Sequence, residues 1–124
     1  MWRNDTLLCK QMEEFTKVRL AQNESLFRDV NEKINDAAQA HGSVPDGHVY
    51  SFFCECADIA CVDRVELTLL EYTTIRGDGK RFAVAPGHAF ADIEEVVEVE
   101  ADHLVVEKVG VAGDVAERLD PRTA

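Results

Sequence analysis

A long run of helix-forming residues near the N-terminus constrains this chain more than any other feature. The segment Leu7–Ala40 contains no Pro or Gly and is rich in Glu, Lys, Gln, Ala and Leu, all of which favour helix. A helix over this segment would be about 50 Å long, at roughly 1.5 Å per residue. That exceeds the width of a single domain of 124 residues. One end of the helix must therefore project, bend, or pack against another subunit.

Apolar residues in this segment recur at helical spacing in two sets. The members of the two sets are Leu8, Met12, Phe15 and Val18, then Phe27, Val30, Ile34 and Ala37. Arg19 and Gln22 fall where a continuous heptad needs apolar residues. Either the helix breaks near Gln22-Asn23, or its two halves face different surfaces. Gly42, with Pro45 close behind, is expected to end the helix.

The remainder of the chain shows strand patterns, turn signals and two short helices. Thr68 and Glu71 have the spacing of a capping box, and Gly77-Asp78-Gly79 is a turn signal. We predict an α+β fold, in which a long N-terminal helix precedes a small antiparallel sheet with a zinc knuckle and two short helices. The predicted strands and helices are Val49–Phe53, Val62–Leu67, a helix from Leu69 to about Arg76, Phe82–Ala85, a hairpin over Glu95–Val109, and a helix over Val111–Leu119.

Charge is distributed unevenly along the chain. The formal net charge is −11; the segment before Gly42 contributes 6 basic and 7 acidic residues, a balance of −1, and the rest contributes −10. A domain of this sign repels a phosphate backbone, so direct nucleic-acid binding is not expected. The acidic part favours a basic protein partner or serves as a solvated surface. We expect Glu94, Glu95, Glu98 and Glu100 to form a solvated face.

The chemistry concentrates in Cys54-Glu55-Cys56-Ala57-Asp58-Ile59-Ala60-Cys61. Three of the 4 cysteines lie in this Cys-x-Cys-x4-Cys arrangement, between two predicted strands. In a reducing compartment such a cluster favours metal or redox chemistry over structural disulfides. Zn2+ neutralises crowded thiolates, and three sulfurs with one imidazole form a closed structural zinc site. The alternative is that the cysteines are small buried apolar residues.

Several residues are candidates for the fourth ligand. We favour His88, because Pro86-Gly87-His88 ends a strand in a rigid turn that can present an imidazole to a neighbouring hairpin. His48 is the main alternative, six residues before Cys54. His103 and Cys9 are further donors that the sequence offers.

Other chemistries fit the sequence less well. An iron–sulfur domain of the CDGSH type begins with Cys-x-Cys, but its third Cys and its His lie close together, whereas Cys61 and His88 are far apart here. Redox switching lacks a Cys-x-x-Cys after a βαβ pattern. The zinc deaminase, His-Glu-x-x-His and phosphate-binding glycine motifs are absent, so we do not expect an enzyme. His41 and His103 are expected on the surface.

The cysteine cluster and the Pro-Gly-His turn also carry a family resemblance. Together with Asn23–Arg28, Glu66-Leu67-Thr68, Glu71-Tyr72 and Arg81-Phe82, they resemble a group of small bacterial zinc-finger-like proteins, mainly actinobacterial. The resemblance covers roughly residues 23–121. It implies that Cys54, Cys56, Cys61 and His88 are the metal ligands, and it implies no activity.

These observations lead to one expected function and two alternatives. We divide the chain into an N-terminal helical segment, residues 1–42, and an acidic zinc-binding α+β domain, residues 43–124, and expect the two to form one compact unit. The leading function is a small zinc-stabilised, non-catalytic protein-binding module with a regulatory role that it performs through protein–protein contact. It would bind a basic protein partner or self-associate through the N-terminal helix. The alternatives are a cysteine-based redox or metal-sensing switch, and a structural accessory subunit of a larger complex.

We see no export signal and no membrane-spanning segment, so a cytoplasmic location is expected.

Overall fold

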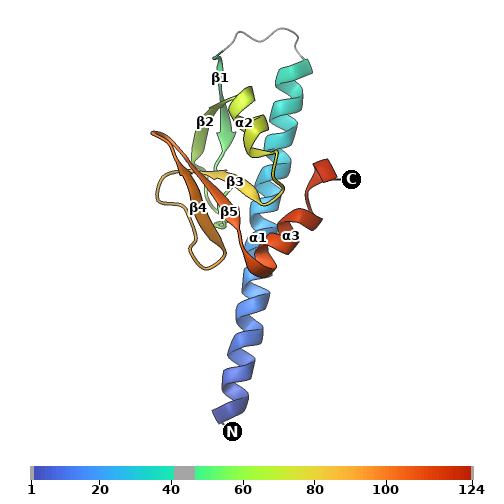
Figure 1. Cartoon of the computed structure of the whole chain (residues 1–124), viewed down its shortest axis with the longest axis vertical. Helices are drawn as coiled ribbons and strands as arrows, with labels where there is room; N and C mark the ends of the chain where they lie inside the picture. The colour runs from blue at the N-terminus through green and yellow to red at the C-terminus, as the bar shows by residue number, and fades with distance from the viewer. Residues whose placement is uncertain (1, 41–46, 124) are drawn as a thin grey trace.

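A long helix organises the molecule, and the other elements pack along its C-terminal half (Figure 1). The computed structural model describes the backbone of residues 2–40 and 47–123, and the side chains of residues 14–40 and 47–122. The expected α+β fold is confirmed. In chain order the elements are α1 (Trp2–Ala40), β1 (Val49–Phe53), β2 (Arg64–Thr68), α2 (Leu69–Ile75), β3 (Arg81–Val84), β4 (Glu94–Val99), β5 (Leu104–Lys108), α3 (Gly110–Arg118) and the 3-10 turn η1 (Pro121–Thr123).

Helix α1 is continuous through Gln22-Asn23, and its N-terminal end extends beyond the rest of the molecule (Figure 1). No helix in the described part of the chain is long and apolar enough to span a membrane. The predicted stop at Gly42 and Pro45 lies outside the described residues, although the helix does end just before it, at Ala40. The helix therefore projects, one of the three outcomes that its length allowed.

The side of α1 that packs on the body is largely polar. Its buried residues are Ala21, Glu24, Ser25, Arg28, Asn31, Asn35 and Ala38. Most residues of the two predicted apolar sets lie outside this buried face. Phe15 and Val30 are 77% and 42% exposed, and Phe27 and Ile34 are only half-buried. Polar residues occupy this face because the elements packed against α1 offer carbonyl groups and charged side chains as partners. Arg28, for example, donates from Nη1 to Gly79 O at 2.7 Å and from Nη2 to Ala116 O at 2.8 Å.

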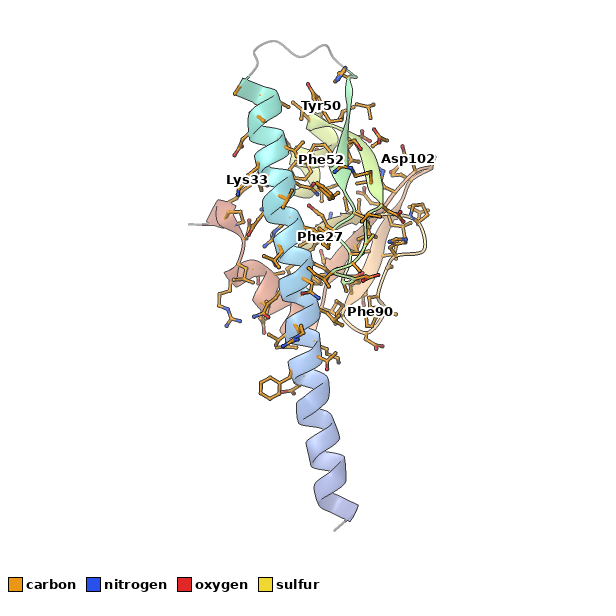
Figure 2. The ribbon with its side chains drawn as sticks, turned by 180° about the vertical axis from the view of Figure 1, so that it is seen from behind. Phe27, Lys33, Tyr50, Phe52, Phe90 and Asp102 are labelled. Carbon is orange, nitrogen blue, oxygen red and sulfur yellow. The ribbon has the colours of Figure 1, made fainter. Side chains whose placement is uncertain are left out.

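The five strands form two antiparallel sheets rather than one. Strands β1 and β2 pair as a hairpin, and β3, β5 and β4 form a second sheet in that order. Phe52 lies between α1 and the strands (Figure 2) and stacks on Tyr72 of α2, with ring centroids 4.5 Å apart. Apolar side chains of both sheets share this core. The two sheets therefore share one hydrophobic core, although no strand of one pairs with a strand of the other.

A buried ion triad connects α1 to the second sheet. The Lys108 ammonium of β5 contacts the carboxylates of Glu24 on α1 and Glu94 on β4, and all three side chains are fully buried. Glu94 also accepts the Phe90 N–H at 2.7 Å. The prediction that Glu94 belongs to a solvated face is therefore wrong, because Lys108 holds its carboxylate inside. Glu95, by contrast, is exposed.

Local sequence signals in the second half agree with the structure. The capping box of α2 is present: Thr68 Oγ1 accepts the Glu71 N–H at 3.1 Å, and the Glu71 carboxylate accepts the Thr68 N–H at 2.9 Å. The predicted β4–β5 hairpin is also present. Its register shifts between Val96 and Glu98, a bulge that the sequence pattern did not reveal.

Candidate metal centre

The cysteine cluster lies in the loop that connects β1 to β2. The Cys54 N–H donates to Asp63 O at 2.9 Å and closes the base of this loop. Strand β3 supports the loop from the side, because the Glu55 N–H donates to Ala83 O at 2.8 Å and the Ala85 N–H donates to Cys54 Sγ at 3.1 Å. The cysteine loop is thus held by hydrogen bonds with the residue that precedes β2, with β3, and with the residue that follows β3.

The imidazole comes from the turn that follows β3. The His88 N–H donates to Ala85 O at 3.0 Å, which closes a four-residue turn with Pro86 and Gly87 at its centre. Gly87 has a φ of +83°, the conformation that a type II turn requires at this position, and proline suits the position before it. The turn directs His88 back to the cysteine loop, as its sequence predicted.

Four donor atoms converge at one point. The sulfurs of Cys54, Cys56 and Cys61 and a ring nitrogen of His88 all lie within 4.8 Å of one another. His88 Nδ1 is 3.5 Å from Cys54 Sγ and 3.6 Å from Cys61 Sγ. Tetrahedral Zn2+, with Zn–S near 2.3 Å and Zn–N near 2.0–2.1 Å, requires a sulfur–nitrogen separation of about 3.6 Å. The spacing therefore fits a tetrahedral metal ion, and the four residues can hold one.

A carboxylate orients the imidazole from behind. His88 Nε2 is 3.1 Å from Asp63 Oδ2. An Nε2–H that donates to this carboxylate leaves the lone pair on Nδ1, the atom that faces the sulfurs. This carboxylate–histidine pair is a recurring support of metal ligands. Asp63 was not among the residues that the sequence analysis selected, since its role depends on a residue in a different turn.

The thiols of the cluster perturb one another. A hydrogen bond from the Cys54 thiol is the main cause that lowers the pKa of Cys56 to about 5. The same hydrogen bond, together with burial, raises the pKa of Cys54 above its ordinary value, and burial raises that of Cys61. The protein alone therefore stabilises one thiolate of the three. A bound cation would supply the charge that lets the other two ionise.

The residue between the first two cysteines points the other way, into the protein. Glu55 is fully buried and accepts hydrogen bonds at 2.9 Å from the Ala83 N–H and from Asn31 Nδ2 of α1. Asn31 also accepts the Phe53 N–H at 2.8 Å. Burial raises the pKa of Glu55 to about 7. The cysteine loop is thus bonded to α1 immediately behind the donor atoms, a connection that the sequence did not predict.

The other candidate ligands lie elsewhere. His48 is exposed and packs its ring edge on Tyr50, with centroids 4.6 Å apart, and it is not a member of the four-residue group. His103 is only 3% exposed, so its predicted place on the surface is wrong; its Nδ1 lies 3.1 Å from Asp102 Oδ1 at the tip of the β4–β5 hairpin. His41 lies outside the described residues, as does the side chain of Cys9.

Comparisons with protein-family models, with curated proteins and with solved structures found no match. The resemblance to small bacterial zinc-finger-like proteins therefore stays a prediction. The interpretation of the site depends on its own geometry.

Proposed function

We propose that this protein is a zinc-stabilised, non-catalytic binding module that acts through contact with other proteins. The observation that carries the proposal is the convergence of three sulfurs and one imidazole within 4.8 Å. Zinc is the metal we assign, because three thiolates with one histidine are a common donor set of closed structural zinc sites. Such a site has no free coordination position, which argues for a structural role.

The binding role is supported by two surfaces. Residues 43–124 carry a net charge of −10, which favours a basic partner through electrostatic steering. On α1, Phe15, Leu26 and Val30 are 77%, 56% and 42% exposed. Their spacing places them on the side of the helix opposite its buried face. We propose that a second copy of the chain covers these apolar residues. This self-association is compatible with binding of a basic partner to the acidic surface.

The metal is tested by elemental analysis and thermal unfolding. We expect about one zinc per chain, and a large fall in melting temperature with chelator, because structural zinc contributes on the order of 10–16 kcal/mol of apparent binding free energy. Cys56→Ser should abolish metal binding and His88→Ala should weaken it. Cys9→Ser and His48→Ala are the matched controls and should retain full zinc content.

Two outcomes would contradict the metal assignment. Loss of zinc in His48→Ala, with full content in His88→Ala, would move the fourth ligand to His48. Metal-free protein with unchanged melting in chelator would refute the metal site, and the cysteines would then be apolar core residues.

A redox or metal-sensing switch is the second candidate, favoured by access to the cluster. A cavity of about 260 Å³ opens beside Cys56 and His88, and Cys61 is only half-buried. Peroxide treatment followed by thiol counting and zinc release separates the two functions. Zinc-ligated structural thiolates should react slowly, whereas sensor thiols should oxidise within seconds to minutes and release the metal.

A further inference from the structure

The side of α1 that faces away from the body of the molecule carries a second pattern. Exposed residues follow one another there at alternating steps of four and three, the spacing of the a and d positions of a coiled coil. We call these residues the outer seam: Phe15, Arg19, Gln22, Leu26, Asp29 and Lys33. Glu24, Asn31 and Ala38, which recur every seven residues, are buried against the body on the opposite side. The outer seam therefore stays open where α1 is docked.

The outer seam alternates between apolar and polar character. Phe15 and Leu26 are exposed apolar side chains, and Val30, one turn further along, adds a third. Arg19 and Gln22 lie between the first two. A hollow of about 360 Å³ beside Phe15 has room for a side chain of a facing helix. It is lined by Phe15, Thr16, Arg19 and Leu20.

The charges of the outer seam determine the direction in which a second copy can face it. In a parallel pair every residue meets its own counterpart, so Arg19 would face Arg19 and Lys33 would face Lys33. Like charges at facing positions destabilise a pair. An antiparallel pair can instead set Phe15 against Leu26 of the second copy. In that register Arg19 faces Gln22, whose side-chain oxygen can accept its N–H groups, and two-fold symmetry repeats each contact.

The shape and charge of the chain favour the same direction. This register is centred near residue 20, close to the middle of α1, so the two helices overlap along nearly their whole length. The N-terminal half of each helix, which projects in Figure 1, then lies along the docked half of the other. Buried residues of α1 run from Ala21 to Ala38, so reversal of one copy separates the two bodies by roughly 30 Å along the axis. Residues 43–124 of each copy carry a net charge of −10, and the separation exceeds the Debye length of about 10 Å.

We propose that two copies of this chain associate by antiparallel pairing of α1 along the outer seam, with Phe15 of one copy against Leu26 of the other. The inference rests on the self-association included in the proposed function, and it specifies the segment that pairs, its direction and its register. The projecting half of α1 is then covered. The two acidic bodies lie at opposite ends of the dimer, where each stays accessible to a basic partner.

Photo-cross-linking of the zinc-loaded full chain reads the direction of pairing. Phe15→p-benzoylphenylalanine introduces a photoreactive side chain, and the irradiated dimer is digested with trypsin and analysed by mass spectrometry. Cleavage after lysine and arginine separates residues 11–17 from residues 20–28. An antiparallel pair should join segment 11–17 of one copy to segment 20–28 of the other, whereas a parallel pair should join segment 11–17 to itself. Mixing isotope-labelled with unlabelled chain identifies the cross-links between copies.

One added carboxylate has opposite effects in the two directions. In an antiparallel pair the new side chain of Gln22→Glu faces Arg19, and the dimer should tighten about tenfold in sedimentation equilibrium, because two charge-assisted contacts form. In a parallel pair it faces its own counterpart, and the dimer should weaken. Gln39→Glu changes an exposed glutamine near the end of the same helix. This matched control should alter the dissociation constant little.

The outcomes separate the inference from the function on which it rests. Cross-links of segment 11–17 to itself or to residues 47–122, a weaker Gln22→Glu dimer, or equal effects of the two variants would overturn the antiparallel register and leave self-association standing. A chain with full zinc content that stays monomeric at high concentration would refute the inference and self-association together. Zinc content is measured on every sample, so a failure of the metal assignment is scored on its own.

Discussion

Removal of the buried ammonium of Lys108 offers the sharpest test of how α1 is held. In Lys108→Met, a side chain of similar length leaves Glu24 and Glu94 fully buried without their common cation. Breaking a buried ion pair from one side costs roughly 3–5 kcal/mol. For a domain of this size that corresponds to a fall in melting temperature of about 10–20 °C, measured by calorimetry or circular dichroism.

The pH dependence of this variant gives a second readout. Burial raises the pKa of Glu24 from 4.5 to about 7, and the attraction of Lys108 opposes that rise. A carboxyl whose folded pKa is raised contributes stability that is present below pH 4.5 and is lost as pH rises through the folded pKa. Without Lys108 the pKa rises further. Both proteins lose stability equally between pH 4.5 and about 7, so the difference in free energy of unfolding between wild type and variant should widen only as pH rises above about 7.

A charge-free control separates electrostatics from packing. Glu24→Gln/Glu94→Gln/Lys108→Met has no buried charge at this position, and replacement of a whole buried ion group is often neutral or stabilising. It should melt within a few degrees of wild type. If Lys108→Met lies within about 1 kcal/mol of wild type at pH 8, or if its deficit does not change with pH, the triad does not hold α1 and the reasoning fails.

Three further predictions address the site, a helix cap and self-association. Asp63→Ala should lower zinc affinity about 10–100-fold in chelator competition, while Asp92→Ala, also a surface aspartate, should not. Thr68→Ala should reduce the free energy of unfolding by about 1 kcal/mol in urea titration, compared with a small change for Thr73→Ala in the middle of the same helix. Phe15→Ser should shift the chain toward monomer in sedimentation equilibrium; a wild-type chain that is monomeric at high concentration would contradict self-association.

The parts of the structure that could be predicted from sequence depend on short-range relationships. Cys54 and Cys56 are two residues apart in one loop, and the Pro86-Gly87 turn determines where His88 points. The capping box of α2 joins Thr68 and Glu71, which are three positions apart. In each case the chemistry lies within one turn of chain, so the local pattern carries the information.

The parts that could not be predicted depend on distant partners. Amphipathic analysis assumes that apolar residues face the core, yet Arg28 occupies the buried face of α1 because its acceptors are carbonyls 51 and 88 residues away. Glu94 is buried because Lys108 meets it there. Nothing in the local sequence distinguishes Glu94 from the neighbouring Glu95, which is exposed.

Hydrogen bonds between the cysteine loop and α1 couple the metal site to the position of the helix. Asn31 makes three hydrogen bonds to this loop and the strand before it, two with the Phe53 backbone and one with Glu55, and Asn23 donates to Ala57 O at 3.1 Å. These two amides hold the helix at both ends of the Cys54–Cys56 segment. Each bond requires the loop in its native shape, since buried amides left unpaired cost about 1–3 kcal/mol each. A metal that fixes the loop therefore also stabilises the docking of α1, and with it the orientation of the stripe around Phe15 that we propose as the surface for self-association.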